Sequence, residues 1–394
     1  MNALRLSLVS LSALLLWLAP ACRSTAAAPQ AEPTGRLVIA GGAVQDGGPI
    51  LPAFVRAARQ AAELRDQDRP LLAVVPTASA DITASIQANE TMLNWFGPDL
   101  EVRGLRLDSN QPAGSSDAAA VRTLSDAAGV WFTGGNQSRI LALFRPQGGG
   151  QQPIDQALAA NLRAGCVIGG SSAGAAMMSD PMIAGGSSDD ALTHGVGPEG
   201  VEMAPGMGFY PFGLVDQHFL MRGRMGRLTV ALAASGKRFG VGIDEDSAWL
   251  VDLALEPVCE AVGVMGVSLL ELTHAPIRKD GGSYGLEWSL LGSGDRWYPK
   301  EERFEPRAGR VAAPQASGSM AIPERLGDPW QEERLRKAIL RLSWDPATPV
   351  VLRNETTEVV LRSGPATRFL VDPGNARDLF AERVLVEIRP LQVR

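Results

Sequence analysis

The sequence has 394 residues, of which 45% are hydrophobic and 20% charged, as is typical of a globular protein. Its length suits one large domain and a smaller one. The formal net charge of −6 offers no basic face, so we expect no nucleic-acid partner. Three cysteines without a Cys-x-x-Cys pair, and three histidines, give little support for a zinc site, so we expect neither a metal nor an organic cofactor.

The N-terminal residues 1–28 predict an export signal. One positive charge is followed by an almost wholly apolar run, residues 6–18, and then by small residues before Cys22. Such a run is too short to span a bilayer but suits the core of a signal peptide. Lipidation of Cys22 and plain cleavage after Ala21 or Ala28 both stay open. We therefore expect an exported protein that is periplasmic, extracellular or lipid-anchored in the envelope.

Short apolar runs then alternate with segments of helical periodicity. Strands are expected over 36–44, 70–77, 100–107, 129–135 and 165–170, and helices over 51–66, 81–96, 116–127 and 154–164. This alternation predicts an α/β fold with a parallel, flavodoxin- or Rossmann-like sheet between layers of helices. Ligands in such folds bind at the carboxyl ends of the strands, which here carry Gly41-Gly42, Thr77-Ala78, residues 133–135 and residues 169–174.

Two further runs, 239–252 and 258–272, predict strands that close a catalytic domain of residues 35–275. The sequence after residue 275 is rich in loop-forming residues. It contains one helical pattern over 329–343 and short strand-like runs at 349–352, 358–361 and 384–388. We interpret residues 280–394 as a smaller accessory C-terminal region of unknown role.

The stretch VIGGSSAGAAMM, residues 167–178, holds two adjacent serines and one G-x-S-x-G motif, Gly170-Ser171-Ser172-Ala173-Gly174. Centring the motif on Ser171 loses the last glycine. In this motif the serine lies on a strained strand-to-helix turn, where the glycines relieve crowding. The spacing therefore favours Ser172 as a nucleophile on such a turn; the alternative is a serine that caps a helix.

A serine nucleophile needs a base, and histidine suits neutral pH. The chain offers three: His194, His218 and His274. His218 lies in the most polar surroundings, and Asp244 and Glu245 follow a predicted strand at the depth of an active site. Two orders stay open at this point: Ser172–His218–Glu245, and Ser172–Asp244/Glu245–His274, which is the order of the α/β-hydrolases.

Four motifs carry a resemblance to a known family: FTGGNQ (132–137), GGSSAGA (169–175), DQHFLMRGRMGRL (216–228) and VGIDED (241–246). They closely resemble the cyanophycinase branch of the S51 serine peptidases, in order over residues 36–272. The resemblance implies a Ser–His–Glu triad: Ser172 as nucleophile, His218 as base and then acid, and Glu245 as the group that orients the imidazole. It also implies an oxyanion hole from backbone N–H groups near Gly135 and of Ala173, and a substrate cleft lined by Gln137, Asp216, Gln217, Arg222, Arg224 and Arg227.

The resemblance further implies hydrolysis of cyanophycin, multi-L-arginyl-poly-L-aspartate, to β-Asp-Arg dipeptides through an acyl-enzyme. Three arginines within six residues suit carboxylate groups of an acidic peptide or of this polymer. The alternatives are a dipeptidase acting on aspartyl or isoaspartyl peptides, a non-catalytic lipoprotein that binds acidic peptides, and an esterase using His274. Other expected partners are a second copy in a homodimer and a membrane, the latter through a lipid on Cys22. The family often has aspartate where this chain has Asn136, and residues 280–394 inherit nothing from the resemblance.

Overall fold

The computed structural model describes residues 34–147, 150–275, 282–315 and 327–391. In it the parallel strands form one half of a nine-stranded sheet. The order is β15-β14-β11-β10-β1-β5-β4-β2-β3. The parallel members are β1 (Arg36–Ala40), β5 (Val167–Ser171), β4 (Gly129–Phe132), β2 (Leu71–Val75) and β3 (Glu101–Gly104). All residues of β2 and β4 are buried, as continuous apolar runs predict for strands covered on both faces. The predicted export signal lies outside the described residues.

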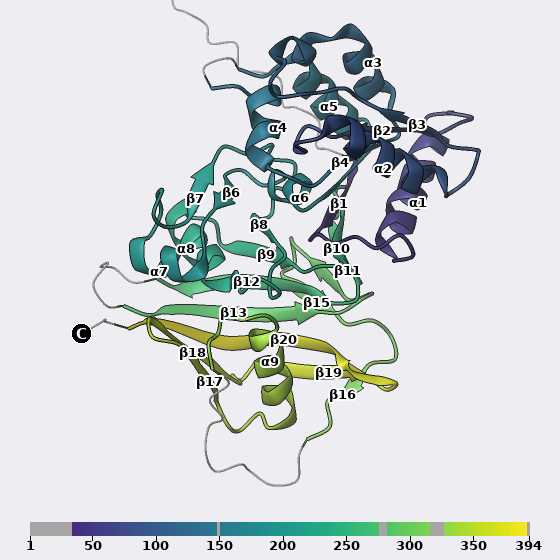
Figure 1. The fold of residues 1–394 in the computed structure, drawn as a ribbon. Coiled ribbons are helices and arrows are strands. Elements are labelled where there is room, and N and C mark those ends of the chain that lie inside the picture. The colour runs from purple at the N-terminus through teal and green to yellow at the C-terminus, as the bar shows by residue number, and fades with distance from the viewer. Residues whose placement is uncertain (1–33, 148–149, 276–281, 316–326, 392–394) are drawn as a thin grey trace, which may run out of the picture. The chain divides into compact units, whose positions relative to one another are not determined.

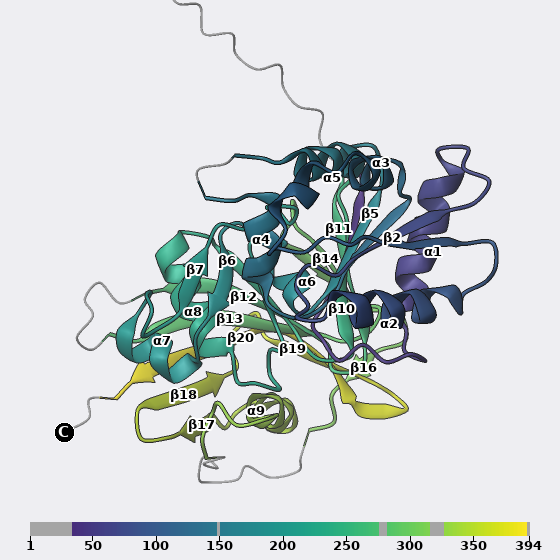
Figure 2. The same cartoon turned by 45° about the horizontal axis from the view of Figure 1, so that its top comes forward.

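Helices cover both faces of these strands (Figure 2). On one face, α1 (Ile50–Glu63) and α2 (Ile82–Asn94) pack on side chains such as Val38 and Trp131. On the other face, alternate strand residues such as Ile39 and Phe132 pack against α3 (Ala118–Asp126), α4 (Gln137–Phe144) and α5 (Pro153–Arg163). The predicted α/β fold is confirmed: strand side chains alternate between two helical layers, each with its own core.

The two long runs predicted to form strands each divide into two strands, and these lie in different sheets. Residues 239–252 divide into β9 (Phe239–Ile243) and β10 (Ser247–Asp252), and residues 258–272 into β11 (Val258–Gly263) and β12 (Val267–His274). The breaks lie at residues with positive φ, Asp246 at 46° and Gly263 at 118°. A Cβ on Gly263 would come within 2.2 Å of the Asp246 carbonyl oxygen, so the two crossings pack against each other. The first break coincides with three acids, residues 244–246, whereas the apolar pattern continues through the second at residues 263–266. Hydrophobic periodicity does not show that either break is a crossing between sheets.

The second sheet has the order β16-β19-β20-β13-β12-β9-β8. Its first part holds β8 (Leu214–Gln217) parallel to β9, and β9 antiparallel to β12. The rest comes from the C-terminal region: β13 (Tyr284–Leu291), β16 (Val311–Ala312), β19 (Arg368–Asp372) and β20 (Asn375–Pro390). Figure 1 shows these strands continuing the sheet beyond β12. The boundary predicted near residue 280 thus runs between β12 and β13, which pair from Val267↔Leu291 onward.

The remaining elements are β6 (Met182–Gly185), α7 (Ser188–His194), β7 (Glu202–Ala204), α8 (Met225–Ser235), β14 (Arg296–Tyr298), β15 (Arg303–Glu305), α9 (Arg334–Trp344), β17 (Val350–Arg353), β18 (Thr357–Arg362) and a short 3-10 helix (Pro112–Ser116). Four of them belong to the two sheets: β14 and β15 end the first, and β17 and β18 join the second, where β18 pairs with β20. The others are helices and the separate β6-β7 pair. α9 packs on β17, β18 and β20. No helix within the described part of the chain combines the length and apolar character needed to cross a membrane.

Candidate active site

Ser172 lies on a sharp turn between β5 and the short helix α6 (Ala173–Ala176), with φ 54° and ψ −106°. The two glycines of the motif are both required by close backbone approach. A Cβ on Gly170 would come within 2.5 Å of the Gly174 carbonyl oxygen, and one on Gly174 within 2.5 Å of the Phe132 carbonyl oxygen. The Ser172 hydroxyl makes no helix-capping hydrogen bond, so the alternative of a structural cap is not realised. Its oxygen instead lies within hydrogen-bond distance of His218, which follows β8 of the second sheet.

A hydrogen-bonded chain runs from Ser172 to His218 and on to Glu245. The distance from Ser172 Oγ to His218 Nε2 is 2.9 Å, and that from His218 Nδ1 to Glu245 Oε1 is 2.6 Å. His218 directly follows β8 and Glu245 follows β9 by two residues, and these strands are parallel neighbours with Gln217 paired to Ile243. Because parallel strands end at the same edge of a sheet, their carboxyl ends bring the imidazole and the carboxylate together.

The other two histidines lie elsewhere. His274 is exposed at the end of β12, and His194 ends α7 with its Nδ1 4.0 Å from Glu199 Oε2. Of the two orders left open by the sequence, the structure assembles only the one through His218.

Asp244, adjacent to Glu245, has a different role. It is 1% exposed, and its carboxylate accepts hydrogen bonds from the backbone N–H groups of Leu220 (2.9 Å), Met221 (3.1 Å) and Glu245 (3.2 Å). Burial raises the pKa of Asp244 to about 6, and these backbone hydrogen bonds oppose the shift. Asp244 therefore folds the turn that follows His218, while Glu245 contacts the imidazole.

Gly42 packs against the His218 ring. Its φ is 127°, and a Cβ there would come within 2.1 Å of His218 Cε1. The backbone of His218, at φ 47°, is held by a hydrogen bond from its N–H to the carbonyl of Gly41 at 2.9 Å. The sequence indicated Gly41-Gly42 only as the end of a strand. The contact with the imidazole could not be predicted from local sequence, because His218 lies 176 residues after Gly42.

The electrostatic surroundings favour a neutral His218. Burial lowers the pKa of the imidazole below its ordinary value, and the positive charges of Arg222 and Arg224 lower it further. The hydrogen bond to Glu245 opposes both. A neutral imidazole whose Nδ1 hydrogen bonds to a carboxylate leaves Nε2 free to accept the Ser172 proton.

Two backbone segments lie beside Ser172, one at Ala173 and one at Gly134. Ala173 is the first residue of α6, so its N–H has no acceptor within the helix. Gly134, which follows β4, approaches the serine closely: a Cβ there would lie 3.5 Å from Ser172 Cβ. The predicted Gly135 lies one residue beyond, with φ 139° and its Cα packed against the Ala78 carbonyl oxygen. Of these two glycines, Gly134 is therefore the one whose Cα faces Ser172.

Three of the predicted cleft residues form hydrogen bonds inside the protein. Arg227, 5% exposed, donates to both carboxylate oxygens of Asp216, at 2.8 and 2.5 Å, and to the Gly186 carbonyl at 2.8 Å. Gln137 is also buried and donates to the carbonyls of Ile183 and Ala184 at 3.0 and 2.9 Å. These side chains support the walls around the site.

Arg222 and Arg224 lie nearer the hydrogen-bonded chain. The Arg222 side chain is 54% exposed, and its guanidinium nitrogen is 3.9 Å from Glu245 Oε1. Arg224 is more buried and donates to the Gln217 carbonyl at 2.5 Å; burial lowers its pKa to about 10. Gln217 itself is buried, and its Oε1 has no partner among the described residues. Arg222 is thus the predicted cleft cation that solvent reaches most easily.

Asn136 caps α4, with its side chain accepting from the Ser138 N–H at 2.9 Å. An aspartate could accept the same hydrogen bond, so the helix cap is kept although this chain has asparagine where the family often has aspartate.

A cavity of about 360 Å³ opens beside Ser171, between α1, α2 and the ends of β4 and β5, and Ser172 is not among its lining residues. Its walls are apolar groups, hydroxyls and an amide, with no charged side chain: Val44, Leu51, Ser79, Ser85, Ala88, Asn89, Met92, Trp131, Thr133, Gly134 and Ser171. Among the described residues, no group of three or more His, Cys, Asp and Glu side chains is placed to hold a metal ion.

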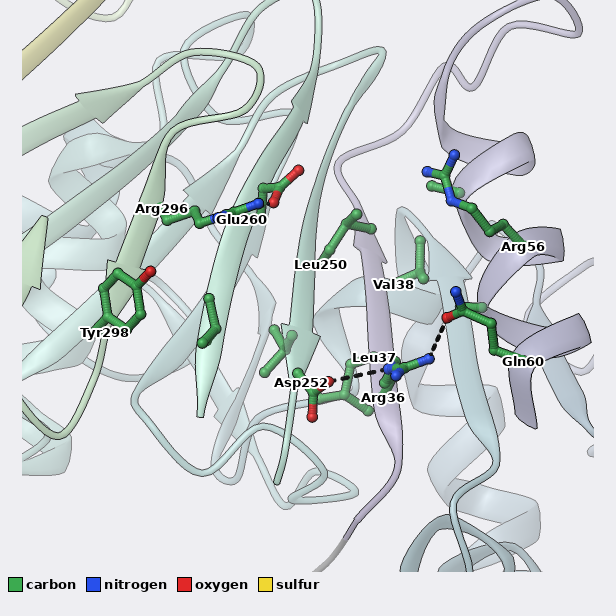
Figure 3. Close-up of a pocket in the computed structure, with 14 residues that line it drawn as sticks. Arg36, Leu37, Val38, Arg56, Gln60, Leu250, Asp252, Glu260, Arg296 and Tyr298 are labelled. Carbon is green, nitrogen blue, oxygen red and sulfur yellow. Dashed lines mark hydrogen bonds and ion pairs between the residues drawn. The ribbon is translucent and has the colours of Figure 1, made fainter. Parts of the chain in front are cut away.

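A second cavity of about 360 Å³ lies between α1 and strands β1, β10, β11 and β14 (Figure 3). Its lining residues Arg36 and Val38 come from the first half of β1, away from the end that pairs with Ser171. Arg36 is paired with Asp252 at 3.1 Å and donates to Gln60 at 2.7 Å (Figure 3). This cavity contains none of the predicted site residues.

The sequence that carries this site matches a known family of peptidases. Residues 37–253 match the model of peptidase family S51. The chain belongs to peptidase family S51. The resemblance drawn from the four motifs is therefore confirmed, and the protein is a peptide hydrolase. The match ends in the loop after β10, so the C-terminal region lies outside it.

Relatives with a named activity are also similar. A cyanophycinase from Trichormus variabilis is 30% identical over 295 residues, which cover 72% of this chain and 92% of the relative. A cyanophycinase from Geminocystis herdmanii is 31% identical over 251 residues, 61% of this chain and 86% of the relative. The solved structure of a peptidase from an acI-B1 Actinobacterium aligns with a TM-score of 0.46 at 19% identity, covering 61% of this chain and 92% of that one.

Proposed function

We propose that this peptidase is an exported serine-type exopeptidase that works through a Ser172–His218–Glu245 triad. His218 Nε2 takes the proton of Ser172 Oγ as that oxygen attacks the peptide carbonyl. Glu245 holds the imidazole in the right tautomer and stabilises it once protonated. The observation that carries the proposal is the continuous hydrogen-bonded chain, with distances of 2.9 and 2.6 Å.

The rest of the cycle uses the groups around Ser172. The N–H groups of Ala173 and of the Gly134-Gly135 turn would bind the oxyanion, where losing one donor typically costs about 3 kcal/mol of barrier stabilisation. His218 then gives its proton to the leaving amine, and an acyl-enzyme remains on Ser172. A water molecule, deprotonated by His218, hydrolyses the acyl-enzyme.

The substrate we propose is cyanophycin, cleaved to β-Asp-Arg dipeptides. Two relatives at about 30% identity are cyanophycinases. The exposed guanidinium of Arg222, with Arg224 behind it, suits a substrate carboxylate beside the reacting carbonyl.

One observation favours a second substrate. The cavity beside Ser171 has no carboxylate among its lining residues, so an arginine side chain bound there would have no partner for its charge. An aspartyl or isoaspartyl dipeptide without arginine would avoid that cost. The non-catalytic alternative gains no comparable support, because the hydrogen-bonded chain is complete.

Export and assembly stay predictions from the sequence. The pattern of residues 1–28 supports export, with Cys22 lipidated or removed with the signal. The mass of the mature chain from a bacterial envelope fraction separates the two outcomes. Light scattering of the purified protein tests the homodimer.

The decisive experiment incubates the mature protein with purified cyanophycin and follows β-Asp-Arg by mass spectrometry. Ser172→Ala and His274→Ala are assayed alongside, together with a β-aspartyl dipeptide lacking arginine. We expect dipeptide release by wild type and His274→Ala and none by Ser172→Ala. Cleavage of the arginine-free dipeptide alone would select the second substrate. Full activity of Ser172→Ala would refute the mechanism.

A further inference from the structure

The first turn of α7 contacts two parts of the chain that are far apart in sequence. One is the C-terminal region, which lies outside the family match. The other is the segment of residues 222–227, which carries Arg222, Arg224 and Arg227 and is called the arginine turn below. Ser188 and Asp189, adjacent at the start of α7, make these contacts with opposite partners.

Asp189 binds the C-terminal region mainly through Oδ1, and Asn354 Nδ2 also donates to its Oδ2 at 3.4 Å. The Oδ1 of Asp189 accepts hydrogen bonds from Trp330 Nε1 at 2.9 Å, Asn354 Nδ2 at 3.1 Å and Thr356 Oγ1 at 2.7 Å. Asn354 is fixed in turn by Asp328, whose Oδ1 it contacts at 3.1 Å. Asp189 is half-buried, and all three donors are neutral side chains. Such a cluster is a directed hydrogen-bond contact rather than a surface ion pair.

Ser188 binds the arginine turn. Its hydroxyl donates to the Gly223 carbonyl at 2.5 Å and accepts from the Arg227 N–H at 3.2 Å. Gly223 is also covered from the C-terminal region: its φ is 56°, and a Cβ there would lie 2.1 Å from the Trp330 carbonyl oxygen. Gly223 is therefore held between Ser188 and the backbone of Trp330, and it separates Arg222 from Arg224 in the sequence.

We propose that the C-terminal region positions Arg222 and Arg224 for substrate binding. Asp189 fixes the first turn of α7 and Trp330, and these two together fix Gly223. The directions of the guanidinium groups on either side follow from that contact. Asp189 and Trp330 are thus positioning residues that touch neither Ser172 nor His218. The inference rests on the proposed function in one respect, that Arg222 and Arg224 bind a carboxylate of the substrate.

The test measures binding of the β-Asp-Arg dipeptide by calorimetry in a Ser172→Ala background, so that it needs no turnover. We expect Asp189→Leu to weaken binding about tenfold by displacing the guanidinium groups. Asp189→Asn keeps an Oδ1 for the three donors and should restore affinity to within about threefold of the background. Glu355→Leu, at an exposed acid between Asn354 and Thr356, is the matched control and should bind like the background.

A double-mutant cycle shows whether Asp189 acts through Arg222. Arg222→Gln should weaken binding, and adding Asp189→Leu should weaken it by much less than tenfold further. Additive losses, or unchanged affinity in Asp189→Leu, would overturn the proposal, as would absence of dipeptide binding to the background protein. Should Asp189→Leu fail to fold, Trp330→Phe removes one hydrogen bond and is expected to weaken binding about threefold; an unchanged affinity there would count against the proposal.

A second readout separates this inference from the proposed function. The rate at which a small fluorophosphonate labels Ser172 needs no guanidinium, so Asp189→Leu in the wild-type background should label within about twofold of wild type. Labelling that falls as far as dipeptide affinity would show a general structural effect and refute positioning. Failure of wild type to label would instead refute the proposed mechanism and leave the dipeptide measurements to decide this inference.

Discussion

Replacing Gly42 with alanine is expected to displace the His218 imidazole and leave the rest of the fold in place. The new Cβ would lie 2.1 Å from His218 Cε1, 2.5 Å from Nε2 and 2.7 Å from Nδ1. Carbon atoms in contact prefer separations of about 3.5 Å, so the ring must retreat by more than about 1 Å. The backbone around Gly42 cannot easily move instead, because the Gly41 carbonyl accepts the His218 N–H.

This displacement sets the size of the effect. A misplacement of about 1 Å at a reacting group can cost about 100-fold in rate. Complete loss of contact with Ser172 approaches removal of the base, which costs about 10⁴-fold or more. We therefore expect kcat to fall between these limits. An alanine at φ 127° also strains the backbone, which lowers the free energy of unfolding by about 1–3 kcal/mol.

The assay compares Gly42→Ala with Gly47→Ala in the same loop. A Cβ on Gly47 meets no atom within 4 Å, so this control should keep the rate of wild type within about twofold. Dipeptide release and fluorophosphonate labelling are measured for both variants, with thermal unfolding to confirm that each is folded. A folded Gly42→Ala with wild-type activity would show that the imidazole does not pack on Gly42, and the reasoning would fail.

Three further predictions follow from the same geometry. Because burial and two cations lower the pKa of His218, kcat/KM should rise with pH through a midpoint below the ordinary histidine pKa. Arg222→Gln removes one of those charges and should move the midpoint to higher pH. A midpoint that stays in place or moves to lower pH would contradict the assignment of His218 as the base. Asp244→Asn loses one acceptor oxygen for the turn after His218 and should lower the free energy of unfolding in urea by about 1–3 kcal/mol, whereas an unchanged denaturation midpoint would mean that the buried N–H groups have other partners. Gly174→Ala forces a Cβ onto a backbone oxygen and should yield little soluble protein, with normal expression and melting temperature as the contrary result.

Much of the fold was predictable because its signals are local. Apolar runs separated by helical periodicity predicted β1 to β5 and the helices α1, α2, α3 and α5, whereas α4 was not predicted. The choice of Ser172 over Ser171 also came from local spacing. Gly170 and Gly174 lie where a Cβ, if present, would be 2.5 Å from a backbone oxygen. Such requirements leave glycines in the sequence at fixed positions.

The partners of Ser172 could not be chosen from residue pattern alone. Asp244 and Glu245 are adjacent acids after the same strand, and only the fold shows that one binds backbone N–H groups and the other the imidazole. The resemblance supplied that choice. No local pattern, and no resemblance, joined Asp189 to Trp330 and Thr356, which lie 141 and 167 residues further along the chain. Contacts of this kind depend on tertiary packing between distant segments.

The central claim, that Ser172 is a nucleophile activated by His218, is tested most directly by locating a fluorophosphonate adduct. The labelled protein is digested, and the peptides are sequenced by mass spectrometry. One adduct on Ser172 is predicted in wild type and in Ser171→Ala, none in Ser172→Ala, and labelling slowed by at least about 100-fold in His218→Ala. An adduct on Ser171, or labelling of His218→Ala at the wild-type rate, would contradict the account.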